Sequence, residues 1–241
     1  MLFERPVLLL ILLSALVLGA CTTRVGPGGQ NETRFEPRYL AKSEIDRVVD
    51  ANRAELAAGL RRIAEKLYKR NPKEWKKSGQ PSAEAALERL FAGRVDFAEL
   101  EGRREGPAVL HAFSASYSGD RVLALMAGLL GMVDAAFEHK ADFYILDSLN
   151  EQKLYNCARN VEIAIWKLAS ARNAVNEVLL LSNELDINQP NLSFEREFGR
   201  VIGLLDFLTR IVADKNGRNL TRFTQSIATA VFLPIGALGI K

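Results

Sequence analysis

Residues 148–185 read SLNEQKLYNCARNVEIAIWKLASARNAVNEVLLLSNEL and contain neither glycine nor proline. Their first four residues, Ser148-Leu149-Asn150-Glu151, match a capping box, in which side chains at a helix start satisfy free backbone N–H groups. At 1.5 Å per residue the stretch allows about 50 Å of helix. It is the clearest helical element of the chain, and the fold is predicted outward from it.

Apolar residues recur along this stretch every seven positions. One set is Leu154, Val161, Leu168 and Val175, and a second set, three residues after each, is Cys157, Ala164, Ala171 and Val178. Such a repeat is typical of a helix that packs lengthwise against a partner, and small residues in the second set allow a close approach. We therefore expect a helix over about 149–185 with one apolar face.

The next helix supplies the partner. A loop over 186–191 contains Pro190, and Ser193 is suited to cap a helix that follows. Its apolar positions alternate steps of four and three: Phe198, Val201, Leu205, Leu208 and Val212. A short connection favours an antiparallel arrangement. The predicted fold class is therefore all-α, a helical bundle built around a long antiparallel helix hairpin, about 149–185 and 194–214.

The rest of the domain, residues 41–241, is also predicted to be helical. Ser43 with Asp46 favours a helix start, Asn71-Pro72 ends that helix, and Ser82 begins another that runs to Gly93. Residues 106–119 fit a helix or a strand. Val122–Val133 carries no charge and is too short to span a bilayer, so we expect the buried central helix there. A last helix is expected to begin at Leu220.

The N-terminus reads as a targeting segment. The apolar run from Val7 to Leu18 covers about 18 Å as a helix, which is short of the roughly 30 Å hydrocarbon core of a bilayer. Small residues follow it directly. Residues 1–20 are therefore interpreted as a signal peptide, with an uncleaved signal anchor as the alternative.

The four residues Leu18-Gly19-Ala20-Cys21 resemble the lipobox of bacterial lipoproteins. The resemblance implies cleavage before Cys21, diacylglycerol on its thiol and acylation of the new amino group. Residues 21–40, rich in Gly, Pro, Asn and Thr, are then expected to be a lipidated flexible tether. Thr22 stands where an Asp would imply inner-membrane retention, so the resemblance implies the periplasmic face of the outer membrane, with the inner membrane as the alternative.

Composition excludes several classes of protein. The 241 residues are 48% hydrophobic and 25% charged, with a formal net charge of +3. These values are typical of a globular domain, and the charge balance is too even for a dedicated nucleic-acid binder. Two Cys and two His are too few for a closed zinc site, so no metal and no cofactor is expected. Cys157 is interpreted as a small buried apolar residue, with cross-linking of two copies as the alternative.

A basic segment, Arg61–Lys77, holds eight basic residues against two glutamates. Such a run is usually a solvated face. The sharper hypothesis is a contact with an anionic membrane surface or an acidic partner. The residues assigned to it are Arg62, Lys66, Lys69 and Lys73.

The C-terminal stretch Phe223–Ile240 carries no charge, but its polar residues and Pro234 argue against a membrane span. We expect a helix and a tail packed on the domain. A second membrane contact or a partner-binding tail is the alternative.

No catalytic motif occurs in the sequence, so no catalytic residue is assigned. The expected function is a non-enzymatic interaction module, an adaptor or scaffold for an envelope protein partner, held at the membrane by the lipid on Cys21. One alternative is a periplasmic enzyme acting on envelope polymers, which a cleft lined by His111 and two or more carboxylates would favour. Another is a carrier of a small apolar ligand in the bundle core.

Overall fold

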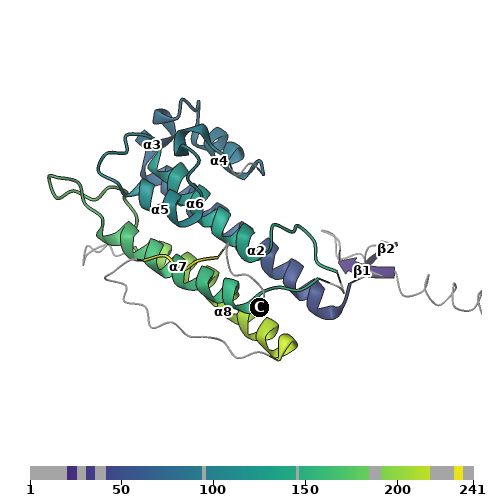
Figure 1. Cartoon of the computed structure of the whole chain (residues 1–241). Helices are drawn as coiled ribbons and strands as arrows, with labels where there is room; N and C mark the ends of the chain where they lie inside the picture. The colour runs from purple at the N-terminus through teal and green to yellow at the C-terminus, as the bar shows by residue number, and fades with distance from the viewer. Residues whose placement is uncertain are drawn as a thin grey trace, which may run out of the picture. The chain divides into compact units, whose positions relative to one another are not determined.

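A computed structural model of the chain describes residues 21–25, 31–35, 42–93, 96–144, 147–184, 191–217 and 231–235 (Figure 1). The signal peptide expected at 1–20 and the start of the last helix, expected at Leu220, lie outside these residues. Contacts divide the chain into two compact units. One comprises residues 1–50 and 142–147, and the other comprises residues 51–141 and 148–241.

The first unit contains a pair of short strands. Strand β1 (Cys21–Val25) pairs antiparallel with β2 (Asn31–Phe35), with Cys21 opposite Phe35. Both lie in the segment 21–40, which the sequence predicts as a flexible tether. Ten residues of that segment therefore have partners in the paired strands.

The first unit also holds the start of helix α2 (Glu44–Arg70). The expected cap is present: the Asp46 carboxylate accepts the Ser43 backbone N–H at 2.8 Å, and the Ser43 hydroxyl accepts the Asp46 N–H at 3.2 Å. Lys42 forms ion pairs with Asp50 and with Asp142, the latter at 2.8 Å. These contacts fix the chain around the first turns of the helix.

The second unit is an all-α helical bundle, as the sequence predicts. After α2, its described helices are α3 (Pro72–Lys77), α4 (Ala83–Phe91), α5 (Glu105–Ala112), α6 (Arg121–Ala136), α7 (Glu151–Ser170) and α8 (Ser193–Asn216), with a 3-10 turn η2 (Ala98–Leu100). The predicted boundaries at Asn71-Pro72 and Ser82 are confirmed. The Ser82 hydroxyl accepts the Ala85 N–H at 3.1 Å.

Helix α6 is the buried centre that the uncharged stretch predicts. Its apolar side chains from Val122 to Val133 are largely inaccessible to solvent, and the Asp120 carboxylate caps it by accepting the Leu123 N–H at 2.9 Å. Helix α5 lies directly against it. A Cβ added to Gly128 would come within 2.6 Å of Val109, so this glycine is what allows the two backbones to approach. The alternative between helix and strand for 106–119 is thus resolved as a helix over Glu105–Ala112.

Helix α7 departs from the prediction at both ends. It begins at Glu151 and is capped by Asn150, whose side chain accepts the N–H groups of Gln152 and Lys153, rather than by Ser148. It ends at Ser170, so the helix expected to continue to about 185 is wrong beyond that point. The apolar face holds up to Leu168, with Leu154, Cys157, Val161, Ala164 and Leu168 all buried. Beyond it, Val175 is 72% exposed.

Asparagine side chains explain the early end of α7. The Asn173 Oδ1 accepts the backbone N–H of Val175 at 3.0 Å and of Glu177 at 2.9 Å, which offers the chain a turn in place of the helix. Asn176 takes a left-handed conformation at φ 63°, which asparagine tolerates better than most residues. The seven-residue apolar repeat does not report either of these effects.

Helix α8 packs along α7 (Figure 1). Arg159 of α7 holds Asp206 of α8 through two bonds of 2.8 and 2.9 Å. Asn216, at the end of α8, donates to Glu151, at the start of α7, at 2.8 Å. The two helices therefore run in opposite directions, over a shorter length than the sequence suggests.

The described part of the C-terminal tail, residues 231–235, lies on α7. Asn160 both donates to the Leu233 carbonyl at 2.8 Å and accepts its N–H at 2.7 Å, and Asn156 donates to the Pro234 carbonyl at 2.8 Å. Ile235 is buried. For these five residues the expectation of a tail packed on the domain is confirmed. Among the described helices, none combines the length and the apolar character needed to cross a membrane.

Candidate functional site

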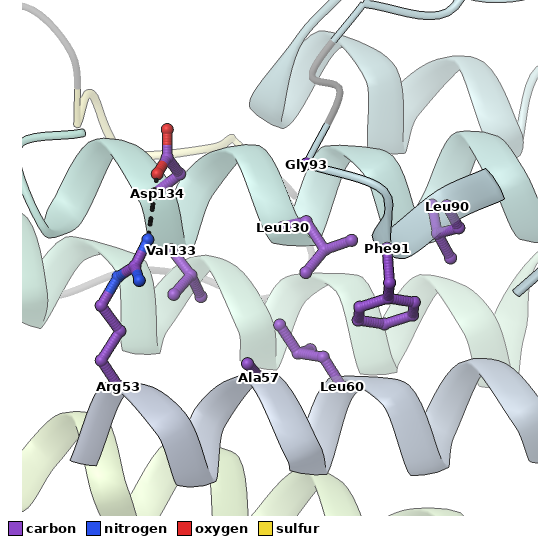
Figure 2. A pocket seen from close by; sticks show the side chains of 9 residues that line it. All are labelled: Arg53, Ala57, Leu60, Leu90, Phe91, Gly93, Leu130, Val133 and Asp134. Carbon is purple, nitrogen blue, oxygen red and sulfur yellow. Dashed lines mark hydrogen bonds and ion pairs between the residues drawn. The ribbon is translucent and has the colours of Figure 1, made fainter. Parts of the chain in front are cut away.

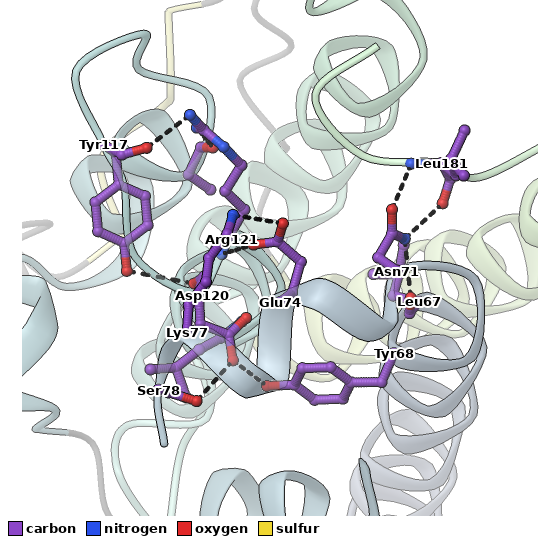
Figure 3. Close-up of polar contacts among 12 residues, drawn as sticks. Leu67, Tyr68, Asn71, Glu74, Lys77, Ser78, Tyr117, Asp120, Arg121 and Leu181 are labelled. Atoms are coloured by element: carbon purple, nitrogen blue, oxygen red, sulfur yellow. Dashed lines mark hydrogen bonds and ion pairs between the residues drawn. The ribbon is translucent and has the colours of Figure 1, made fainter. Parts of the chain in front are cut away.

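A network of buried polar side chains joins α2, α3 and α6 (Figure 3). Asp120 accepts hydrogen bonds from Tyr68 at 3.0 Å and Ser78 at 3.2 Å, and Glu74 accepts the backbone N–H of Arg121 at 2.8 Å. Burial raises the pKa of Asp120, and the bonds from Leu123 and Tyr68 offset part of that rise.

The guanidinium of Arg121 completes the network. It donates to the Tyr117 carbonyl at 2.7 Å (Figure 3). It also donates to the carbonyls of Ala112 and Ser114, at 2.5 and 2.9 Å. The Arg121 donors bond to backbone oxygens, and the carboxylates of Asp120 and Glu74 bond to groups nearby in the same network. The network therefore fixes α3 and the loop after α5 to the start of α6. We assign it a structural role.

His111 lines neither of the two pockets described below. Its ring packs on Tyr117 with centroids 4.1 Å apart, and burial lowers its pKa. The neighbouring hydroxyls of Ser114 and Ser116 bond to each other at 2.9 Å. Among the described residues, His111 is therefore placed as an aromatic packing partner.

An apolar pocket with a volume of about 200 Å³ lies between α2, α4 and α6 (Figure 2). We call it the apolar pocket. Its lining residues are Arg53, Ala57, Leu60, Leu90, Phe91, Gly93, Leu130, Val133 and Asp134. Figure 2 shows the two charged side chains together at one end and Leu90 with Phe91 at the other. The pocket therefore has an apolar body and one polar end.

Asp134 belongs to two pockets at once. Its Oδ1 lies 3.5 Å from an Arg53 Nη at the apolar pocket, and its Oδ2 lies 2.6 Å from His139 Nδ1. His139 and Glu105, with Asp134, line a second, smaller pocket of about 140 Å³. Burial raises the pKa of Glu105, against the opposing charges of His139 and Arg104.

Three residues in or next to this second pocket have a strained backbone conformation. Glu105, Glu138 and His139 have φ values of 49°, 56° and 57°, a left-handed conformation that such residues rarely adopt. A histidine oriented by a carboxylate is the arrangement of a general base. However, the residues that line this pocket include no serine, threonine or cysteine to act as a nucleophile. No metal-binding group of three or more acidic, His or Cys residues occurs in the described part of the chain.

The four basic residues proposed for an anionic surface are distributed over several contacts. Arg62 donates to Glu197 of α8 at 3.0 Å, Lys66 donates to the Ser193 carbonyl at 3.3 Å, and Lys69 pairs with Glu65 at 2.5 Å. Lys73 is exposed on α3. Two of these four side chains therefore hold α2 to the start of α8, and the contact with an anionic surface stays a prediction.

The pairing with α8 has an electrostatic consequence at Glu197. Burial by itself would raise the pKa of this carboxyl, but the hydrogen bond from Arg62 and the charge of Arg200 lower it overall. Arg62, which was expected to contact an anionic surface, thus helps to stabilise the carboxylate form of Glu197.

A second candidate surface is the segment 171–184, which we call the exposed loop. It presents Val175, Val178 and Leu181, which are 72%, 38% and 48% exposed. Asn71 fixes its base, because this side chain accepts the Leu181 N–H at 2.8 Å and donates to the Leu181 carbonyl at 2.9 Å (Figure 3). Leu180, beside them, is buried.

The comparisons with known proteins give no relative for the chain. No family model matches it, and no curated protein and no solved structure shows significant similarity to it. The function must therefore be argued from the residues themselves.

Sequence reasoning missed Arg53, Asp134, His139 and the exposed loop. A signal existed for Asp134, which is the first charge after the uncharged stretch Val122–Val133. Asn173 and Asn176 were a signal for the loop, since asparagine favours turns. Nothing in the sequence relates Arg53 to Asp134, because the two residues are 81 positions apart and meet only when α2 packs against α6.

Proposed function

We propose that the chain is a lipid-anchored protein at the periplasmic face of a bacterial outer membrane. In this proposal its helical domain is a non-enzymatic interaction module, an adaptor or scaffold for an envelope protein partner in envelope assembly or maintenance. The observation that carries the interaction role is the exposed loop, which holds apolar side chains in water on an ordered backbone.

The anchoring half of the proposal rests on Cys21. The four residues Leu18-Gly19-Ala20-Cys21 follow the apolar run directly, in the register of a lipobox. Two or three acyl chains, at about 0.8 kcal/mol per buried methylene, provide a stable anchor. Inner-membrane retention is the alternative location.

The interaction half rests on the energetics of the exposed loop. Val175, Val178 and Leu181 lose the benefit of burial in the free chain, and a partner that covers them restores it. The bonds from Asn71 and Asn173 already fix the backbone, so a partner that binds there meets a smaller entropy cost than at a disordered segment.

Site-specific photo-cross-linking in the native envelope tests the interaction role. A photoreactive amino acid at Val175 in the lipidated full chain is expected to give a discrete adduct, which Leu181→Asp in the same chain weakens. Phe207, which is 57% exposed on α8, is the matched control position. Absence of an adduct at Val175, or the same adducts from both positions, contradicts the proposal.

A further inference from the structure

The apolar pocket has the size of a small ligand. Its volume is about 200 Å³, and an apolar cavity of about 150 Å³ accepts benzene, so a straight chain of about six to eight carbons fits. Its walls are aliphatic and aromatic side chains from three helices, Leu60 of α2, Phe91 of α4 and Leu130 of α6 among them (Figure 2). Such walls favour a hydrocarbon body.

The charged end of the pocket selects the head group. Each carboxylate oxygen of Asp134 already has a nitrogen nearby, Arg53 at 3.5 Å and His139 at 2.6 Å. The hydrogen-bond donors of Arg53 are less fully used. Its Nε is buried without a hydrogen-bond partner in the described part of the chain, and its contact with Asp134 is at the limit of a hydrogen bond. The free capacity at this end is therefore that of a donor.

A guanidinium with spare donors binds a carboxylate better than other acceptors, because two parallel N–H groups match its two oxygens. Arg53 is part-buried, with a side chain 30% exposed, so such a bond would form partly out of water, where it is stronger. We infer that the apolar pocket binds a medium-chain monocarboxylate, with its tail between α2, α4 and α6 and its head group on Arg53. This inference goes beyond the proposed partner-binding role and does not use the exposed loop.

Photolabelling of the lipidated full chain in membrane vesicles tests the inference. The probe is an octanoic acid that carries a diazirine in its tail, and tryptic mapping by mass spectrometry locates the label. We expect the label on α2, α4 or α6, and we expect octanoate to compete roughly tenfold better than octanol, because a hydrogen bond to a charged group contributes about that much.

Three variants separate the roles of head group and tail. Arg53→Met keeps the length of the side chain and is expected to bring octanoate and octanol to equal competition. Ala57→Phe fills the exposed mouth of the pocket and is expected to reduce labelling at least roughly fivefold. Ala51→Phe, on an exposed part of α2 outside the lining, is the matched control and is expected to label as the unmodified chain does.

Circular dichroism establishes that each variant is folded before labelling is compared. Labelling that is unchanged in both folded Arg53→Met and folded Ala57→Phe overturns the inference. Stronger competition by octylamine than by octanoate also overturns it, because Asp134 rather than Arg53 would then hold the head group.

Discussion

The first and second halves of residues 148–185 carry the same apolar period and adopt different structures. Up to Leu168 the period is that of a helix, and its apolar side chains are buried against neighbours. From Ala171 onward Val175 and Val178 continue the period in sequence but lie in solvent on the exposed loop. The comparison teaches that a seven-residue repeat predicts helix only where tertiary burial supports it and no side chain competes for the backbone.

The largest expected effect separates the two halves directly. Ala164 is fully buried on α7, so Ala164→Glu places an unpaired charge in the core and is expected to lower the free energy of unfolding by about 3–5 kcal/mol. Ala171→Glu, at the end of the helix, is expected to cost about 1 kcal/mol or less. Urea denaturation measures both. Equal losses would mean that the helix continues through residue 171.

A second prediction weakens the base of the exposed loop. Asn71→Ala removes both hydrogen bonds to the Leu181 backbone and one to Leu67, and is expected to cost about 1–3 kcal/mol of local stability. Amide hydrogen exchange should show loss of protection at Leu181 with α7 unchanged. Asn183→Ala, which removes a single exposed bond to Glu195, is the control. Similar exchange in the two variants would argue against Asn71 as the anchor.

Much of the fold could be predicted from local signals. The capping residues Ser43 and Ser82 marked helix starts, and apolar spacing identified the buried face of α8. Ser193 is the first residue of α8 but does not cap it, because the N-cap position is Leu192 and no side chain bonds there. The end of α7 could not be predicted by period alone, because it depends on hydrogen bonds from Asn173 to its own backbone. Local signals fit residues 106–119 to either a helix or a strand, because they do not report the close packing of α5 on Gly128 of α6.

The candidate sites were less accessible from the sequence. Cys21 could be proposed as a lipid site because a lipobox is a local pattern. The polar end of the apolar pocket requires Arg53 from α2 and Asp134 from α6, and no local pattern reports such a meeting. For the basic segment, charge counting could not reveal that Glu197 is the partner of Arg62, and the contact with an anionic surface stays a prediction.

A third prediction concerns the left-handed residue of the exposed loop. Asn176 has φ 63°, so Asn176→Ala is expected to destabilise the loop locally by about 1 kcal/mol, whereas Asn176→Gly keeps that conformation accessible. Trypsin cleavage after Arg172 is the readout. We expect roughly fivefold faster cleavage for the alanine variant than for the glycine variant. Identical rates would indicate that this turn does not limit opening of the loop.

The smallest expected effect is a pH dependence of the unfolding free energy that arises from Glu105, beside helix α7. Glu105 lies near Lys153 and Cys157 of α7, and burial raises its pKa above the ordinary 4.5. The folded chain therefore binds this proton more tightly than the unfolded chain does, so Glu105 contributes a rise in unfolding free energy as pH falls from 7 towards 5. Glu105→Gln should remove that contribution.

The matched control for the pH dependence is Glu101→Gln. The hydrogen bond and charge of Arg103 lower the pKa of Glu101, so its contribution to stability is lost as pH falls, which is the opposite sign. Urea midpoints between pH 7 and 3 compare the three chains, because the contribution of Glu101 is lost only below its ordinary pKa of 4.5. If Glu105→Gln left the profile unchanged, burial of that carboxyl would not be coupled to stability.

The anchor is the central claim of the proposed function, and the mass of the N-terminal tryptic peptide tests it most directly. In protein isolated from its own envelope, we expect the peptide Cys21–Arg24 to begin at Cys21 and to carry diacylglycerol on the thiol and an acyl group on the amine. Cys21→Ser should abolish this peptide and release the domain from the membrane. A free thiol at Cys21, or a peptide in which Ala20 still precedes it, would contradict the account.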